Sequence, residues 1–326
     1  MKKPVSLLQF YLMAAWLAFG YCAPASAAAL SCHGYAAENI NFGNINLLDS
    51  TPVNRIAQIS YGCDNGDQPT EVLLCISAGP SPVSLSYDPR YMQLVDTSQS
   101  GSLAYNLYQD AAATTILGST GGAAAPLAFI TTIVPYYDEG SITIYGRVAP
   151  FGQAGSPNGY YGAALPLKLS YMANETGANC SSPKLVLGQT WSLQVETFVT
   201  SQCHINQTST LNFGTVPGLL TNNVDGASAI NLTCTSALPY FVGLDNGQHA
   251  DGAIRRMQGP NGYIQYELYR DSQRTQKWGN AGDNTDKAPG TGTGSSQAFT
   301  VYGRVMPQTF TSSGTFSDTI VVTVTY

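Results

Sequence analysis

The chain has 326 residues, of which 44% are hydrophobic and only 10% are charged, and 33 are glycine. So few charges beside so many small and β-branched residues are typical of an extracellular β protein and unfavourable for long solvated helices. Acidic residues outnumber basic ones by 20 to 14, which argues against a nucleic-acid partner or an anionic membrane surface.

Residues 1–27 have the three parts of a secretory signal peptide. Lys2 and Lys3 form a basic start, "LLQFYLMAAWLAFG" is an apolar run, and Ala25–Ala27 offers a small-residue cleavage site. The apolar run is too short and wrongly flanked for a stable membrane span. We therefore predict removal of residues 1–27 and export of a soluble chain. Without Lys2 and Lys3 this chain has 12 basic and 20 acidic residues.

The remaining chain repeats itself. Cys32 and Cys63 are 31 residues apart, as are Cys203 and Cys234, and Asn-Phe-Gly starts nine residues after the first cysteine of each pair. Further on, "YNLYQD" in the first repeat matches "YELYRD" in the second, "YGRVAP" matches "YGRVMP", and "GYYGAALPLKLSY" matches "GTFSDTIVVTVTY". Four matching blocks in the same order, about 160 residues apart, indicate a duplicated domain rather than a solenoid repeat.

Each repeat consists of short alternating stretches separated by glycine, proline, asparagine and aspartate, with no helical period. This pattern predicts an all-β fold of two tandem immunoglobulin-like (pilin-type) β-sandwich domains, over residues 28–200 and 201–326. Pro166 falls within the first domain's last repeated strand. Because proline cannot donate to a sheet ladder, we expect that strand to lie at an edge.

Six cysteines remain after residues 1–27 are removed. An even number in an exported chain predicts three disulfides, and closing a loop of about 30 residues contributes roughly 3–4 kcal/mol. None of the spacings is the CxxC of a metal or redox site. The expected pairs are Cys32–Cys63 and Cys203–Cys234, from the equal spacing in the two repeats, and Cys75–Cys180, by elimination.

A further strand lies between the last repeated strand of the first domain and the first cysteine of the second. In residues 189–200 polar Ser192, Gln194 and Glu196 occupy one face of an extended chain. We expect the strand near 189–200 to complete the first domain in cis. Its opposite, apolar face consists of Trp191, Leu193, Val195 and Val199.

The second domain has no comparable strand after its last repeated stretch. A sandwich that lacks its final strand exposes an apolar groove and an unpaired sheet edge. We therefore expect residues 201–326 to accept a strand from another chain, by main-chain pairing along the edge and insertion of alternate side chains into the groove. The apolar face of the predicted acceptor strand consists of Phe316, Ile320, Val322, Val324 and Tyr326.

The start of the mature chain offers no strand in return. Only residues 28–31 precede Cys32, whereas a longer alternating segment precedes Cys203. A subunit that receives a strand and lends none fits only at one end of a linear polymer. We expect the chain to be such a terminal subunit.

These motifs resemble the spore coat protein U domain family, which includes subunits of archaic chaperone–usher pili of Gram-negative bacteria. The resemblance rests on "YGRV", on the glycine-led stretch 314–326 and on a cysteine separated by eight residues from Asn-Phe-Gly. It is strong over residues 201–326 and weaker over 30–171. It implies a two-domain tip adhesin, exported through the periplasm to the cell surface, that mediates surface attachment and biofilm formation. The implied partners are a periplasmic chaperone, an outer-membrane usher and a neighbouring subunit.

Comparison of the repeats indicates a contact surface in the first domain. Residues 272–297 contain several charged side chains, whereas the equivalent residues 111–137 contain none, although 127–137 also fits a core strand. A duplicated scaffold in which one loop turns apolar gains a contact surface there. We expect this stretch and the loop at 150–161 to contact an abiotic or host surface. The residues chosen for this role are Leu117, Pro126, Leu127, Phe151 and Tyr160.

Catalysis has little support in the sequence. His33 and His204 hold the same repeat position beside a cysteine, and His249 lies in a polar turn. No nucleophile turn, HExxH or phosphate loop is present, and the acidic residues lack EF-hand spacing. We expect neither an enzyme nor a bound cofactor or metal.

Two alternatives to a tip adhesin that binds surfaces broadly stay open. A lectin-like adhesin with a specific carbohydrate ligand would have aromatic and polar side chains in a concave pocket of the first domain. A free-standing secreted coat or matrix protein would have a second domain that is already complete and monomeric.

Overall fold

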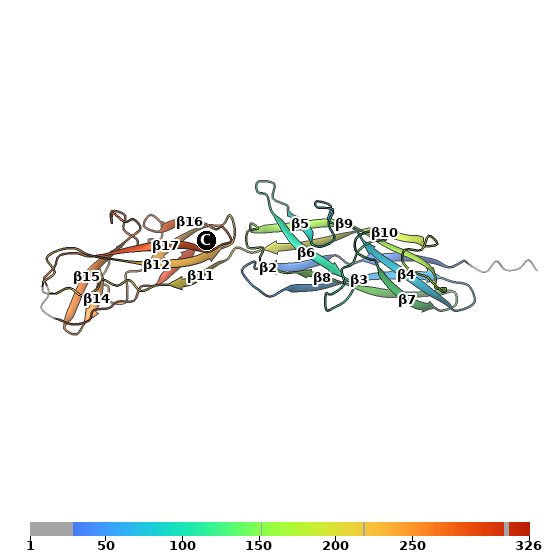
Figure 1. The fold of residues 1–326 in the computed structure, drawn as a ribbon, viewed down its shortest axis with the longest axis horizontal. Helices are drawn as coiled ribbons and strands as arrows, with labels where there is room; N and C mark the ends of the chain where they lie inside the picture. Colours follow the sequence, from blue (N-terminus) through green and yellow to red (C-terminus); the bar gives the residue numbers. More distant parts are fainter. Residues whose placement is uncertain (1–28, 151, 218, 310–312) are drawn as a thin grey trace, which may run out of the picture.

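The computed structural model describes residues 29–326 except 151, 218 and 310–312. The predicted signal peptide lies outside the described residues. The described chain is all β and contains two large hydrophobic cores, one in each body, and a small third cluster around Cys75 and Cys180. The two bodies lie end to end (Figure 1), and the predicted fold class of two tandem immunoglobulin-like sandwiches is confirmed.

The first body is a ten-stranded sandwich. One layer is β1–β3–β8–β6, and the other contains β5–β9–β10–β2, with β4 and β7 continuing it beside β9. Strand β6 joins the layers, because its first half pairs with β5 and its second half with β8. The strands are β1 (Ser31–Ala37), β2 (Ile40–Ile45), β3 (Val53–Asp64), β4 (Thr70–Ala78), β5 (Arg90–Leu94), β6 (Ser102–Tyr108), β7 (Leu127–Ile133), β8 (Tyr137–Val148), β9 (Gly159–Ala173) and β10 (Val186–Val199).

The second body has five strands in one layer, in the order β11–β12–β17–β15–β14, and three in the other, in the order β16–β13–β18. Its first pair repeats the first pair of the chain, because β1–β3 and β11–β12 have a register shift at aligned positions. The strands are β11 (Cys203–Thr208), β12 (Val224–Cys234), β13 (Pro239–Leu244), β14 (Arg255–Gly259), β15 (Gly262–Tyr269), β16 (Ala288–Thr291), β17 (Gln297–Val305) and β18 (Val322–Thr325).

Strand β9 shows how the sequence builds the first core. Leu165, Leu167 and Leu169 are fully buried, while the residues between them, including Pro166, are exposed. The expectation that this strand lies at an edge is wrong, because β10 pairs along one side of β9 and β5 and then β4 pair along the other. Pro166 lies where the neighbour changes from β5 to β4, so its missing N–H falls between two ladders.

The described residues contain three disulfides, Cys32–Cys63, Cys75–Cys180 and Cys203–Cys234, which are the pairs expected from the equal spacing and by elimination. The first and third link aligned positions of β1–β3 and β11–β12. Within the described part of the chain, no helix has the length and hydropathy that a membrane span requires.

A short connection joins the two bodies. The Thr200 N–H donates to the Ile45 carbonyl of the first body at 2.9 Å, and the Gln202 N–H donates to Thr235 Oγ1 of the second at 3.1 Å. Only Ser201 stands between these two anchored residues. Because the anchors are so close in sequence, this link is tied down on both sides.

Candidate functional site

Strand β10 completes the first body. It pairs antiparallel with β9 along its whole length and parallel with β2 from Val195 to Val199. Leu193, Val195 and Val199 are fully buried, and Trp191 is half-buried over Gly34. The strand predicted to act in cis therefore pairs on both edges and supplies its apolar face to the first core.

The Asn-Phe-Gly motif shapes the segment next to β10. The Gly43 N–H donates to Asn41 Oδ1 at 2.7 Å, and the Gly214 N–H donates to Asn212 Oδ1 at the same distance. Both glycines have a φ near +75°, which side chains strongly disfavour. In the first body this turn lies within β2 and leaves Phe42 fully buried.

The corresponding place in the second body holds no strand among the described residues. Strand β18 is the counterpart of β9, and among the described residues it pairs with β13 on one side and with no strand on the other. Residues 211–216, the counterpart of β2, form no strand. Both edges that hold β10 in the first body are therefore open in the second.

Aligned apolar side chains differ in exposure accordingly. Leu165 and Leu167 are fully buried under β10, whereas Ile320 and Val322 are half-buried and Tyr326 is 57% exposed. Four of the five predicted acceptor residues, all except Tyr326, thus form the margin of the second core rather than its interior. The same contrast of buried and half-buried holds for Tyr161 and Phe316, Leu169 and Val324, Ile40 and Leu211, and Phe42 and Phe213.

A polar network holds the predicted acceptor stretch, residues 314–326, against the rest of the second body. The Asp318 side chain, almost fully buried, accepts a hydrogen bond from the Tyr266 hydroxyl at 2.7 Å and lies 3.0 Å from His249 Nδ1. Burial and the Asp318 carboxylate raise the pKa of Tyr266, so its hydroxyl remains a donor. In the first body the aligned positions are Ala163 and Tyr105, and the Tyr105 hydroxyl is buried with no hydrogen-bond partner among the residues that the structure describes.

The sequence prediction missed this network. Its signal is the acidic Asp318, which interrupts the apolar face of the stretch 314–326. A carboxylate on the inward face of a strand is costly unless it is hydrogen-bonded. Because Asp318 is anchored, the predicted acceptor stretch is held against the second body at this position.

The end of the first body remote from the second exposes several aromatic and aliphatic side chains. The Tyr35 and Tyr137 hydroxyls contact each other over Gly62. Beside them Val134 is exposed and Tyr136 is 73% exposed. Tyr136 has a φ of +74°, and its main chain is hydrogen-bonded in both directions to the loop at residues 65–66. The backbone thus holds a strained residue with its ring in solvent, a pattern common at functional sites.

The five residues predicted to make surface contacts differ in their exposure to solvent. Leu117 is fully buried in the first core, so its prediction is wrong. Pro126 and Leu127 are half-buried, and Leu127 opens β7 and packs against the core. Tyr160 is exposed on β9. Phe151 lies outside the described residues.

Part of the predicted contact loop at 150–161 faces the second body. Pro157 forms a bridge with Ser236, and Ala154 approaches Gly294 so closely that a Cβ on this glycine would collide with the Ala154 carbonyl. This loop therefore belongs to the junction between the bodies. Its prediction as a contact loop at a free end is wrong, because sequence alone does not show which end of a sandwich meets the next domain.

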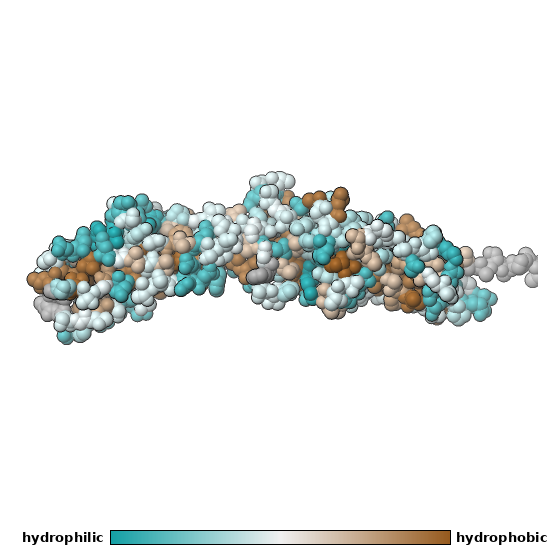
Figure 2. Space-filling model, viewed as in Figure 1, coloured by the Kyte–Doolittle hydropathy of each residue, from teal (hydrophilic) through white to brown (hydrophobic). Residues whose placement is uncertain are grey.

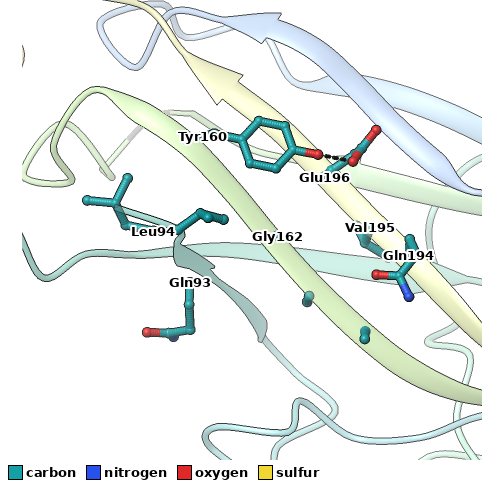
Figure 3. A pocket seen from close by; sticks show the side chains of 10 residues that line it. Gln93, Leu94, Tyr160, Gly162, Gln194, Val195 and Glu196 are labelled. Carbon is teal, nitrogen blue, oxygen red and sulfur yellow. Dashed lines mark hydrogen bonds between the residues drawn. The ribbon is translucent and has the colours of Figure 1, made fainter. Parts of the chain in front are cut away.

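A shallow depression of about 320 Å³ lies over β9 and β10, beside β5. Gly162 and Ala164 leave it open, because they have almost no side chain to fill it. The Tyr160 hydroxyl donates to Glu196 (Figure 3), whose other carboxylate oxygen accepts from Asn41 Nδ2 at 2.7 Å. The rim combines an aromatic ring, a carboxylate, an aliphatic side chain and two amides, namely Tyr160, Glu196, Val95, Gln93 and Gln194.

The titratable side chains form no metal site within the described ranges, because no group of three His, Cys, Asp or Glu residues is placed to hold an ion. His33 packs edge-on against Tyr35 with 4.8 Å between ring centroids. The space-filling view shows apolar patches on the first body and at the outer end of the second (Figure 2). The features that stand out are thus surfaces and a strand edge.

Comparison with known proteins places the chain in a family. The model of the Spore Coat Protein U domain matches residues 21–165 and again residues 189–323. The chain belongs to the spore coat protein U domain family. The second family region begins at Gln189, inside β10, yet β10 pairs within the first body. The strand that opens one family region therefore completes the other.

Individual relatives share limited sequence identity with this chain. Protein U of Myxococcus xanthus is 33% identical over 130 residues, which cover 36% of this chain and 72% of that protein. A chain of the CsuC–CsuE chaperone–tip adhesion subunit complex from archaic chaperone–usher Csu pili of Acinetobacter baumannii has a TM-score of 0.46 and 15% identity, covering 91% of this chain and all of that one. The CupB6 tip adhesin from Pseudomonas aeruginosa has a TM-score of 0.37 and 12% identity, covering 91% and 94%.

Proposed function

We propose that the chain is a subunit of a chaperone–usher pilus and that its second domain, residues 201–326, accepts a donor strand from a neighbouring subunit. The contrast between β9 and β18 carries this proposal. The same alternating face is buried under β10 in the first body and half-buried beside an open edge in the second. A strand of alternating residues beside β18 would pair with that edge and cover Ile320 and Val322.

The energetics favour such a partner. Full burial of one valine or isoleucine side chain contributes roughly 1.5–3 kcal/mol relative to full exposure, and several half-buried side chains line this margin. An open apolar edge is also an aggregation hazard during export. A periplasmic chaperone that lends a strand, and an outer-membrane usher that exchanges it for a subunit's strand, meet both needs.

Use of β10 in cis supports a place at the tip of the fibre. In ordinary subunits of the family the segment before the first cysteine complements a neighbour, whereas here the segment before Cys203 is held between β9 and β2. The first domain then projects from the fibre and acts as the adhesin for abiotic or host surfaces, in support of biofilm formation. Its remote end presents Tyr35, Val134, Tyr136 and Tyr137 for contact with apolar surfaces.

Strand addition tests the proposal. A copy of residues 188–200 is joined by a flexible linker after Tyr326, and the exported, disulfide-bonded protein is compared with the unaltered chain in sedimentation and urea unfolding. We expect the appended strand to remove aggregation through the second domain and to make that domain more stable. The matched control carries Leu193→Asp in the appended copy only. An unaltered chain that is already monomeric and equally stable would instead support the free-standing coat or matrix protein.

Adhesion is tested at the remote end. Val134→Asp and Tyr136→Asp are expected to weaken attachment of piliated cells to a hydrophobic surface without changing the amount of pili. Ile56→Asp is the control, because Ile56 is another exposed apolar residue, on β3. Undiminished attachment of the first two variants would contradict a role for this end.

The depression at Tyr160 favours a second candidate, the lectin-like adhesin. An aromatic ring beside amides and a carboxylate offers stacking and hydrogen bonds to a sugar. This candidate predicts that Tyr160→Ala and Glu196→Gln abolish binding to a glycan array. Unchanged binding of both variants, or no glycan binding by the unaltered chain, would exclude the depression as a sugar site.

A further inference from the structure

We infer that β7 is a self-association edge, through which two copies of this chain pair their first domains antiparallel. Strand β7 pairs with β4 over all seven of its residues. No strand in the described ranges pairs with its other side. Figure 1 shows β7 beside β4, at the end of the first body away from the second.

The second body shows what a protected version of this edge looks like. Its counterpart β16 has only four residues, Ala-Pro-Gly-Thr, including Pro289. Strand β7 has seven residues, Leu-Ala-Phe-Ile-Thr-Thr-Ile, with no proline, glycine or charge. Edge strands of monomeric proteins are usually kept from pairing by shortness, proline or charge. Of the two duplicated edges, only the first domain's lacks all three safeguards.

The direction of the main-chain groups follows from the pairing of β4. The Glu71 carbonyl accepts a hydrogen bond from the Asn174 N–H, just beyond the end of β9. Odd-numbered residues of β4 therefore face β9 and even-numbered ones face β7, where their partners are odd-numbered. Hence Ala128, Ile130 and Thr132 turn their N–H and C=O groups toward the open side.

A two-fold axis through Ile130 makes this edge complementary to itself. Ile130 then lies opposite its own copy and Ala128 lies opposite Thr132, in hydrogen-bonded pairs that supply about six main-chain bonds. The cross-strand side-chain pairs are Ile–Ile and Ala–Thr on one face, and Leu–Ile and Phe–Thr on the other. β-branched and aromatic pairs of this kind are favourable across strands.

The chemistry of the strand selects a second copy as the occupant. An isologous pair sets every side chain against its own two-fold mate, and β7 contains no charge that would be repelled by its copy. Ile130 is 54% exposed, so its side chain is available to the partner strand. This contact is separate from the proposed donor-strand site on β18, and on pili it would join two fibres at their tips.

Sedimentation equilibrium of the exported, disulfide-bonded chain tests the inference. Over a concentration series we expect a monomer–dimer equilibrium that Ile130→Lys and Thr132→Pro abolish. Thr132→Pro removes an outward N–H and leaves the ladder with β4 in place. The control is Ile56→Lys. Ile56 is 57% exposed on β3, so this substitution adds the same charge away from the β7 edge. Urea unfolding of each variant shows that the first domain is still folded.

Two further measurements distinguish association through β7 from association through β18. The amides of Ala128, Ile130 and Thr132 should gain protection from hydrogen exchange as the protein concentration rises. The dimer should also persist when a strand is appended to fill the second domain. Monomeric protein throughout, a dimer that Ile130→Lys leaves unchanged, or a dimer lost when the second domain is filled would each overturn the inference.

Discussion

Truncation of one aligned pair of side chains tests whether β18 lacks the cover that β9 has. Leu165 is fully buried beneath β10, whereas its counterpart Ile320 is half-buried. Leucine-to-alanine changes in a closed core cost about 2–5 kcal/mol, because a cavity remains where the side chain was. Leu165→Ala should lower the free energy of unfolding of the first domain by that amount. Ile320→Ala removes a side chain that already touches water, so we expect about 1–2 kcal/mol.

The two domains can be followed separately in one unfolding experiment. Of the three tryptophans, Trp16 belongs to the predicted signal peptide, while Trp191 lies on β10 and Trp278 is buried in the second core. Trp191→Phe leaves Trp278 as the reporter of the second domain, and Trp278→Phe leaves Trp191 as the reporter of the first, provided that the appended copy carries phenylalanine in place of its own tryptophan. Urea unfolding is then recorded for each alanine variant with and without the appended copy of residues 188–200.

The appended strand should change only one of the two costs. Once a strand covers β18, we expect the cost of Ile320→Ala to rise into the range of Leu165→Ala, which should stay as it was. Equal costs of the two changes in the unaltered chain would mean that the second core is already closed. A cost of Ile320→Ala that the strand leaves unchanged would mean that the strand does not bind there. Either result would refute the reasoning.

Two further predictions concern one charged side chain in each domain. Arg90 is fully buried and donates to the carbonyls of Gly79 and Leu117, so Arg90→Met should destabilise the first domain by more than about 2 kcal/mol in urea unfolding, and a neutral result would contradict this. The hydrogen bond from Arg304 lowers the pKa of Asp225, so this stabilisation is present above the ordinary pKa of about 4 and is lost as the pH falls through the lower folded value. Asp225→Asn should flatten the acid limb of the second domain's stability curve, and an unaltered limb would show that the ion pair contributes nothing.

Local pattern was enough to predict the duplication, the disulfide pairs and the strand at 189–200. Equal cysteine spacing and repeated blocks are properties of the chain itself. A two-residue period shows which side chains of a strand share a face, so the buried positions Leu193, Val195 and Val199 were predictable. The same period gave the apolar face of β18. These conclusions need no knowledge of which strands are neighbours.

Neighbour relations were decided by the tertiary structure alone. The period that identifies a strand is the same at an edge and in the middle of a sheet, so Pro166 was misplaced. The sequence of an apolar loop does not show whether a given side chain enters the core or meets solvent, so Leu117 was misassigned. The open sides of β7 and β18 likewise follow from pairings between segments far apart in sequence. Alternation is a local property of the chain, whereas an edge is defined by which strand lies beside it, and only the fold settles that.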